Sequence, residues 1–135
     1  MRLRILIADD SPQVRRAIVS LLSNAAFCET CREASDSDET LQKATKLLPD
    51  VALLDISMPG VSGLETARLL RKLVPGTKVL IITHHDTRQL LPFAREVGAV
   101  GCLDKSLLGS ELIPALKNIL STRASADEQS HPSHS

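Results

Sequence analysis

The stretch VALLDISMPG, residues 51–60, decides the fold of this 135-residue chain. A short apolar run leads into a single carboxylate, Asp55, and the chain then breaks at Pro59-Gly60. Such a run is typical of a strand buried on both faces of a parallel sheet, and Pro-Gly marks a loop. Asp55 is therefore predicted to lie where a buried strand ends and a loop opens, either as a solvated strand terminus or as a reactive group.

Strand-like and helix-like patterns alternate along the rest of the chain. Strands are predicted over residues 3–8, 28–34, 51–55, 78–83 and 99–105, and helices over 12–25, 36–49, 62–74, 87–97 and 110–121. Asp36 with Glu39 and Ser62 with Glu65 form capping boxes at two of the helix starts. This alternation predicts an α/β, flavodoxin-like (βα)5 fold, a doubly wound parallel five-stranded sheet in the order 2-1-3-4-5.

The length of the chain fits one domain, which we place at residues 1–121. Residues 122–135 are polar and lack an apolar period, so they are predicted to form a flexible tail. Lys+Arg and Asp+Glu balance at 16 each, which favours neither nucleic acid nor an anionic membrane as a partner. No segment resembles a membrane span or a signal peptide, and three Cys are too few for a disulfide framework. A cytoplasmic location is therefore expected.

Three carboxylates are predicted to converge at the carboxyl edge of the sheet. Asp9 and Asp10 follow the first strand and Asp55 ends the third, and ligands of open α/β sheets gather at this edge. If these strands are neighbours, the like charges repel unless a hard divalent cation such as Mg²⁺ lies among them. Thr83 and Lys105 end the neighbouring strands and offer a hydroxyl and a point charge that suit phosphate. The set predicts phosphoryl transfer onto Asp55.

Four segments resemble the signature segments of the receiver domain of bacterial response regulators, the CheY-like phosphoproteins of two-component signalling. They are ILIADDSPQVR, VALLDISMPGVSGLE, KVLIITHH and VGCLDKS, and the resemblance covers about residues 2–121. The segment THHDT, which begins at Thr83, is similar to the corresponding segment in receivers of nitrate-response and quorum-type regulators.

The resemblance implies that Asp55 is the phospho-acceptor in a phosphorelay. It implies that Mg²⁺ is held by Asp10, Asp55 and the backbone carbonyl of Ser57, and that Asp9 acts in the outer coordination sphere. The phosphoryl donor would be a histidine kinase, a phosphotransfer protein or a small acyl phosphate. The chain would be a signalling protein rather than an enzyme, although it would catalyse its own phosphorylation and dephosphorylation.

By the same resemblance, Thr83 would sense the phosphoryl group and Lys105 would pair with it. The family commonly has Tyr or Phe three residues before this Lys, a switch side chain that turns inward on activation, and the present chain has Cys102 at this position. It also commonly has Pro after the Lys, with a cis peptide, where this chain has Ser106. A cis bond before a residue other than Pro costs about 2.5–4 kcal/mol, so a trans bond is expected at this position. These departures alter the switch surface and leave the phosphorylation chemistry intact.

We interpret the chain as a stand-alone receiver that signals by conformational change and contact with a downstream protein. We expect it to have no nucleic acid or membrane partner and to be a monomer or a weak homodimer. Two alternatives stay open. The chain could be the receiver half of a DNA-binding transcriptional regulator, which a longer reading frame encoding a helix-turn-helix would reveal. It could also be a degenerate receiver that acts as a phosphate-independent interaction module, which a failure of acyl phosphate to modify Asp55 would reveal.

Overall fold

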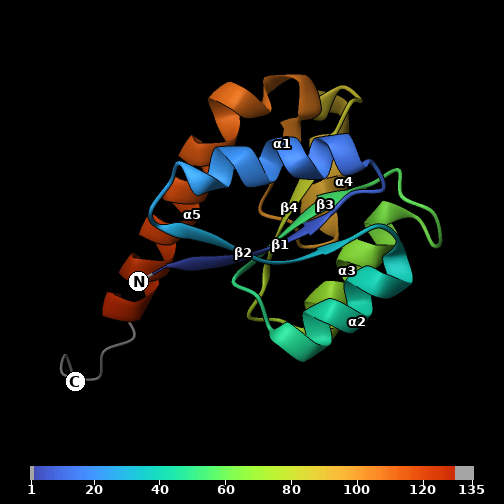
Figure 1. Cartoon of the computed structure of the whole chain (residues 1–135). Helices are drawn as coiled ribbons and strands as arrows, with labels where there is room; N and C mark the ends of the chain where they lie inside the picture. The colour runs from blue at the N-terminus through green and yellow to red at the C-terminus, as the bar shows by residue number, and fades with distance from the viewer. Residues whose placement is uncertain (1, 130–135) are drawn as a thin grey trace.

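The computed structural model describes residues 2–129 and places five parallel strands in one sheet (Figure 1). The strands are β1 (Leu3–Ala8), β2 (Cys28–Ala34), β3 (Val51–Asp55), β4 (Lys78–Thr83) and β5 (Gly101–Asp104). The helices are α1 (Pro12–Ser23), α2 (Ser37–Leu47), α3 (Gly63–Leu73), α4 (Thr87–Glu96) and α5 (Leu108–Gln129), and a 3₁₀ turn covers Lys105–Leu107. The strand order β2-β1-β3-β4-β5 confirms the predicted fold class and topology.

Each face of the sheet has its own apolar core, because successive strand residues point to opposite sides. One core includes Ile5 and Leu53 and is covered by α1 and α5. The other includes Leu6 and Leu54 and is covered by α2, α3 and α4. All of β3 is buried, since this central strand has neighbours in the sheet on both sides and helices over both faces. This burial explains the continuous apolar run that precedes Asp55.

The predicted helix starts agree with the caps that the structure contains. Ser11, Asp36 and Ser62 each accept a hydrogen bond through the side chain from the backbone N–H three residues further on. Each cap satisfies one of the N–H groups that the first turn of a helix leaves without an intrahelical partner. The described residues contain no cis peptide bond, so the bond before Ser106 is trans, as expected.

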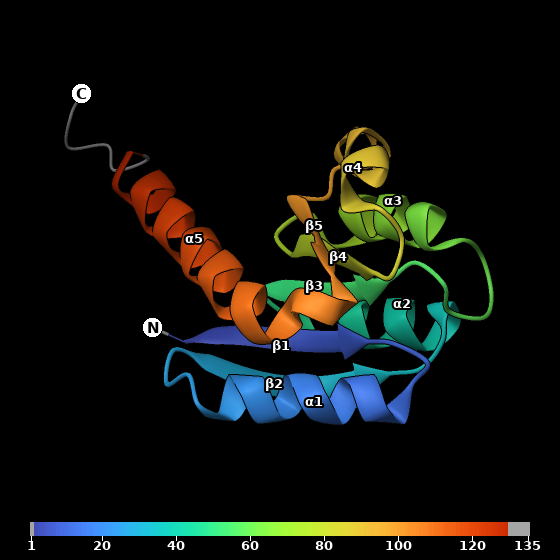
Figure 2. The same ribbon diagram turned by 90° about the horizontal axis from the view of Figure 1, so that it is seen from above.

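The last helix differs most from the sequence-based expectation. The sequence predicts a helix over 110–121, but α5 runs over Leu108–Gln129 and projects beyond the sheet (Figure 2). Residues 122–129, predicted to begin a flexible tail, are therefore helical. No Gly or Pro interrupts them, and Ala, Arg, Glu and Gln are good helix formers, so local propensity extends the helix without an apolar period. Residues 130–135 of the predicted tail lie outside the described residues, and the boundary between domain and tail stays a prediction.

Across residues 2–129, no helix combines the length and the apolar character that crossing a bilayer requires.

Candidate functional site

The register of the sheet aligns the carboxyl ends of four strands at one edge. Ala8 at the end of β1 pairs with Leu54 of β3, and Thr83 at the end of β4 pairs with Asp104 of β5. The residues that end or follow these strands are the ones predicted to form the site: Asp9, Asp10, Asp55, Thr83 and Lys105.

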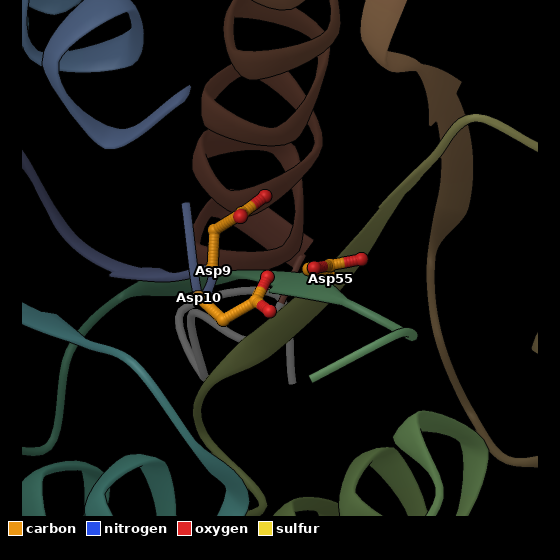
Figure 3. Close-up of side chains that lie close together, drawn as sticks. All are labelled: Asp9, Asp10 and Asp55. Carbon is orange, nitrogen blue, oxygen red and sulfur yellow. The ribbon is translucent and has the colours of Figure 1, made fainter. Parts of the chain in front are cut away.

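Asp9, Asp10 and Asp55 form a cluster of carboxylates (Figure 3). One oxygen from each lies within 4.8 Å of the others. Asp9 and Asp55 are 0% and 1% exposed, whereas Asp10 is exposed to solvent. Three oxygen ligands at this spacing could hold a metal ion, and they suit a hard divalent cation that also keeps water ligands.

Lys105 places its ammonium group against the two buried carboxylates. Nζ lies 2.7 Å from Asp9 Oδ2 and 3.2 Å from Asp55 Oδ2, and the Lys105 side chain is only 8% exposed. These contacts are ion pairs between opposite charges, and apart from Lys105 neither Oδ2 atom has a hydrogen-bonding partner among the described residues. Two inward-facing oxygens thus share a single cation. The candidate ligands are all carboxylate oxygens and outnumber the one ammonium, which fits a bound divalent ion.

Lys105 is predicted to end the fifth strand, and it lies just beyond that end. The strand stops at Asp104, and Lys105 begins the 3₁₀ turn. The Asp104 carboxylate accepts hydrogen bonds from the backbone N–H of Ser106 at 2.9 Å and from its hydroxyl at 2.7 Å. An Asp side chain that bonds the backbone two residues on makes a turn that competes with an extended strand.

Backbone N–H groups fix the other oxygen of each buried carboxylate. Ser11 N–H donates to Asp9 Oδ1 at 2.8 Å, and Ser57 N–H donates to Asp55 Oδ1 at 3.0 Å. Because one oxygen is held in this way, the second oxygen of each carboxylate faces Lys105 and the interior of the cluster. The loop after β3 therefore helps to orient Asp55.

Burial raises the pKa of Asp55, and Asp9 raises it further, while the Ser57 N–H and Lys105 lower it by less in total. Burial alone would lower the pKa of Lys105, but the contacts with Asp9 and Asp55 outweigh it and raise this pKa. The site thus keeps its ammonium charged and makes an ionised Asp55 costly. A second cation would relieve that cost.

Arg15 in the first turn of α1 contacts the backbone of Asp9, and it was not identified from the sequence. Its Nη1 donates to the backbone carbonyl of Asp9 at 2.6 Å, and its Nε pairs with Glu33 of β2 at 2.9 Å. One signal was available, because a cation near a helix N-terminus opposes the helix dipole and needs a partner to offset that cost.

Thr83 and Cys102 lie outside the ion-pair cluster. The Thr83 side chain is buried, and its hydroxyl oxygen accepts a hydrogen bond from His85 N–H at 3.0 Å. Cys102 is half-buried in β5, packs against the core that α4 covers, and carries a free thiol whose pKa is raised by burial. It lies in β5, the strand that leads to Lys105.

Comparison with known proteins gives one consistent result. Residues 5–117 match the family model described as "Response regulator receiver domain". The transcriptional activator protein ExaE of Pseudomonas putida is 33% identical over 120 residues, which span 89% of this chain and 56% of ExaE. The chain spans about half the length of the curated relatives it matches.

Two solved structures are similar in both fold and sequence. A two-component response regulator of the LuxR family from Aurantimonas sp. SI85-9A1 has a TM-score of 0.84 and 30% identity, covering 90% of this chain and 87% of that chain. The signal receiver domain of NarL from Mycobacterium tuberculosis has a TM-score of 0.80 and 34% identity, covering 87% and 94%.

Proposed function

Because this chain belongs to the response regulator receiver family, close to the NarL and LuxR regulators, we propose that it accepts a phosphoryl group on Asp55. It is a signalling module rather than a conventional enzyme. The observation that carries the proposal is the buried Asp55 carboxylate, paired with the Lys105 ammonium and grouped with two further carboxylates at the sheet edge. A histidine kinase is the partner that this family implies. A phosphotransfer protein is a second source of the phosphoryl group, and we place the relay in the cytoplasm.

The proposed cofactor is Mg²⁺. The carboxylates of Asp10 and Asp55 and the backbone carbonyl of Ser57 would bind it, and Asp9 would act in the outer coordination sphere. The supporting observation is the set of three carboxylates, whose charge exceeds that of the one ammonium and whose two buried Oδ2 atoms have Lys105 as their partner among the described residues. When bound, Mg²⁺ would neutralise charge on the phosphoryl oxygens.

In the proposed reaction, Asp55 Oδ2 attacks the donor phosphorus. A bond forms between this oxygen and phosphorus as the bond to the leaving group breaks. Lys105, whose Nζ lies 3.2 Å from this oxygen, would pair with the charge on the transferred group. The Thr83 hydroxyl keeps its own proton while it accepts from His85 N–H, so it could donate that proton to a phosphoryl oxygen.

The direct test is the intact mass of the protein after treatment with acetyl phosphate and Mg²⁺. The proposal expects a gain of one phosphoryl group that peptide mapping assigns to Asp55. A protein of unchanged mass would favour the alternative of a phosphate-independent interaction module.

A second proposal is that this receiver works as part of a DNA-binding transcriptional regulator. The observation that favours it is the kinship with ExaE, a transcriptional activator of which this chain spans only 56%. The charges of residues 1–135 balance, so we propose that this chain acts by protein contact, as a monomer or weak homodimer, and that DNA contacts would come from a separate domain. A reading frame that continues past Ser135 into a helix-turn-helix would support this proposal, and a stop codon there would contradict it.

The Asp10→Ala variant tests the proposed metal site. Mg²⁺ binds only the folded protein, so it should raise the melting temperature of the wild type in a concentration-dependent way. Asp10 is the exposed member of the cluster, so its loss should weaken Mg²⁺ binding about tenfold or more without disturbing the core. Calorimetric titration of both proteins measures this, with the exposed Asp38→Ala as the control. Equal Mg²⁺ affinities in wild type and Asp10→Ala would contradict the ligand assignment.

The Cys102→Tyr variant tests the altered switch position. A ligand or modification shifts an equilibrium only through its different contacts with the two states, and the small Cys102 thiol offers little contact area to change. We therefore expect phosphorylation to move residues 87–105 less in the wild type than in Cys102→Tyr. Hydrogen exchange with and without a phosphoryl mimic measures the difference, with Cys102→Ala as the control. A large wild-type response that Tyr does not increase would show that ring size is irrelevant in this protein.

A further inference from the structure

The loop between β3 and α3, residues 56–62, carries Ser57, and its two ends lie close together. A Cβ atom on Gly63 would lie 2.2 Å from Ile56 Cα, so only glycine lets the two ends of the loop approach so closely. Most of the loop is exposed, and Met58 is its one buried residue. The path of the chain between Ser57 and Ser62 therefore depends on a few specific contacts.

The middle of this loop rests on Ser37, the first residue of α2. The Ser37 backbone N–H donates to the carbonyl of Pro59 at 3.2 Å. Its hydroxyl lies 3.0 Å from the carbonyl oxygen of Val61 and 3.2 Å from that of Pro59. Since the N–H already serves Pro59, the single hydroxyl proton best serves Val61. Ser37, on a helix that is distant in sequence, thus binds two carbonyl groups of the loop.

Two neighbours fix this contact. Thr66 Oγ1 of α3 lies 3.2 Å from the Ser37 hydroxyl oxygen and 3.1 Å from the carbonyl oxygen of Ser62, so it contacts both Ser37 and the end of the loop. Gly60 has φ +106°, and a Cβ atom there would come within 3.0 Å of Ser37 Cβ and Oγ. The loop therefore passes directly over Ser37, in a backbone conformation that favours glycine.

We infer that Ser37 is a positioning residue for phosphoryl transfer: it fixes the loop that presents Ser57 to Asp55 and to the metal. The inference rests on the proposed function. Ser37 is 1% exposed and is not needed as the helix cap, because Asp36 already accepts the N–H of Glu39. Its hydroxyl therefore has the loop as its main partner, and its effect reaches Asp55 through the Ser57 N–H.

The Ser37→Ala variant removes the hydroxyl and keeps the N–H. Calorimetric titration should show Mg²⁺ binding weakened about threefold to tenfold, the effect of one lost hydrogen bond. Amide exchange at residues 57–62 should become faster in the same protein. Ser35→Ala is the matched control, because its hydroxyl is exposed and contacts Glu39 rather than the loop. It should leave both measurements unchanged.

Gly60→Ala disturbs the same contact from the loop side, because its Cβ atom would crowd Ser37. It should weaken Mg²⁺ binding and speed amide exchange at residues 57–62, as Ser37→Ala does. If Ser37→Ala and Gly60→Ala both retain wild-type Mg²⁺ affinity and wild-type exchange in the loop, the inference is overturned. Faster loop exchange in the two variants supports the role of Ser37 in holding the loop, even if the wild type takes up no phosphoryl group. A wild type that takes up no phosphoryl group would overturn the proposed function alone, so the two failures are distinguishable.

Discussion

The Asp55→Asn variant is expected to gain no mass on treatment with acetyl phosphate and Mg²⁺, while the wild-type protein gains one phosphoryl group. The reason is chemical, because an amide oxygen cannot serve as the nucleophile that a carboxylate provides. The fold should persist, since Asn has the same shape and its side-chain oxygen can still accept the N–H of Ser57. Intact-mass spectrometry measures the result directly.

Asp36→Asn is the matched control for this experiment. It makes the same chemical change at a residue that caps α2, and Asn caps helices as well as Asp does. We expect this variant to be labelled like the wild type. Labelling of Asp55→Asn to the wild-type level would refute the assignment of Asp55 as phospho-acceptor.

The Lys105→Met variant is expected to lose about 3 kcal/mol of unfolding free energy at neutral pH without metal, because it leaves buried carboxylates without their cation. The lost contacts are the ion pairs to Asp9 and Asp55. Urea unfolding followed by circular dichroism measures the change, since the chain contains no Trp. Lys117→Met, an exposed change on α5, should stay within about 0.5 kcal/mol of the wild type.

The deficit of Lys105→Met should shrink as the pH falls from 7 towards 5. The folded state raises the pKa of Asp55, so the stability that this group contributes is full below its ordinary pKa and is lost as the pH rises through the folded value. Removing Lys105 removes a charge that lowers this pKa, so the pKa should rise further and the loss at pH 7 should grow. A deficit that is equal at pH 7 and pH 5 would contradict this account.

The sequence predicted the sheet because burial leaves a strong local mark. The run before Asp55 is apolar throughout, since β3 is covered on both faces, and that pattern identifies a central parallel strand. The strand-end acids were then placed together correctly by topology alone. The pattern was weaker where structure depends on local polar bonds or on propensity. The turn at Asp104 and the extension of α5 past Ser121 are the two examples.

The supports of the site could not be predicted from local patterns. Ser37 meets Pro59 and Val61 across more than twenty positions of sequence, through hydrogen bonds to backbone carbonyls. Such bonds depend on the path of a loop, and the residue types of the acceptors do not reveal them, because every residue has a backbone carbonyl. Arg15 likewise acts on a backbone oxygen of Asp9, so only its unfavourable place in the helix hints at a role.

The strand order also determines when this protein can complete its fold during synthesis. Asp9 and Asp55 meet as soon as β1 pairs with β3, but the ammonium that neutralises them belongs to a residue far along the chain. Until Lys105 has left the ribosome, pairing of β1 with β3 brings two carboxylates together without the chain's own counter-charge, which opposes their pairing. Docking of the last strand therefore supplies the edge of the sheet and brings Lys105 to the two carboxylates, and we expect the nascent domain to fold as one cooperative unit only after Lys105 has emerged.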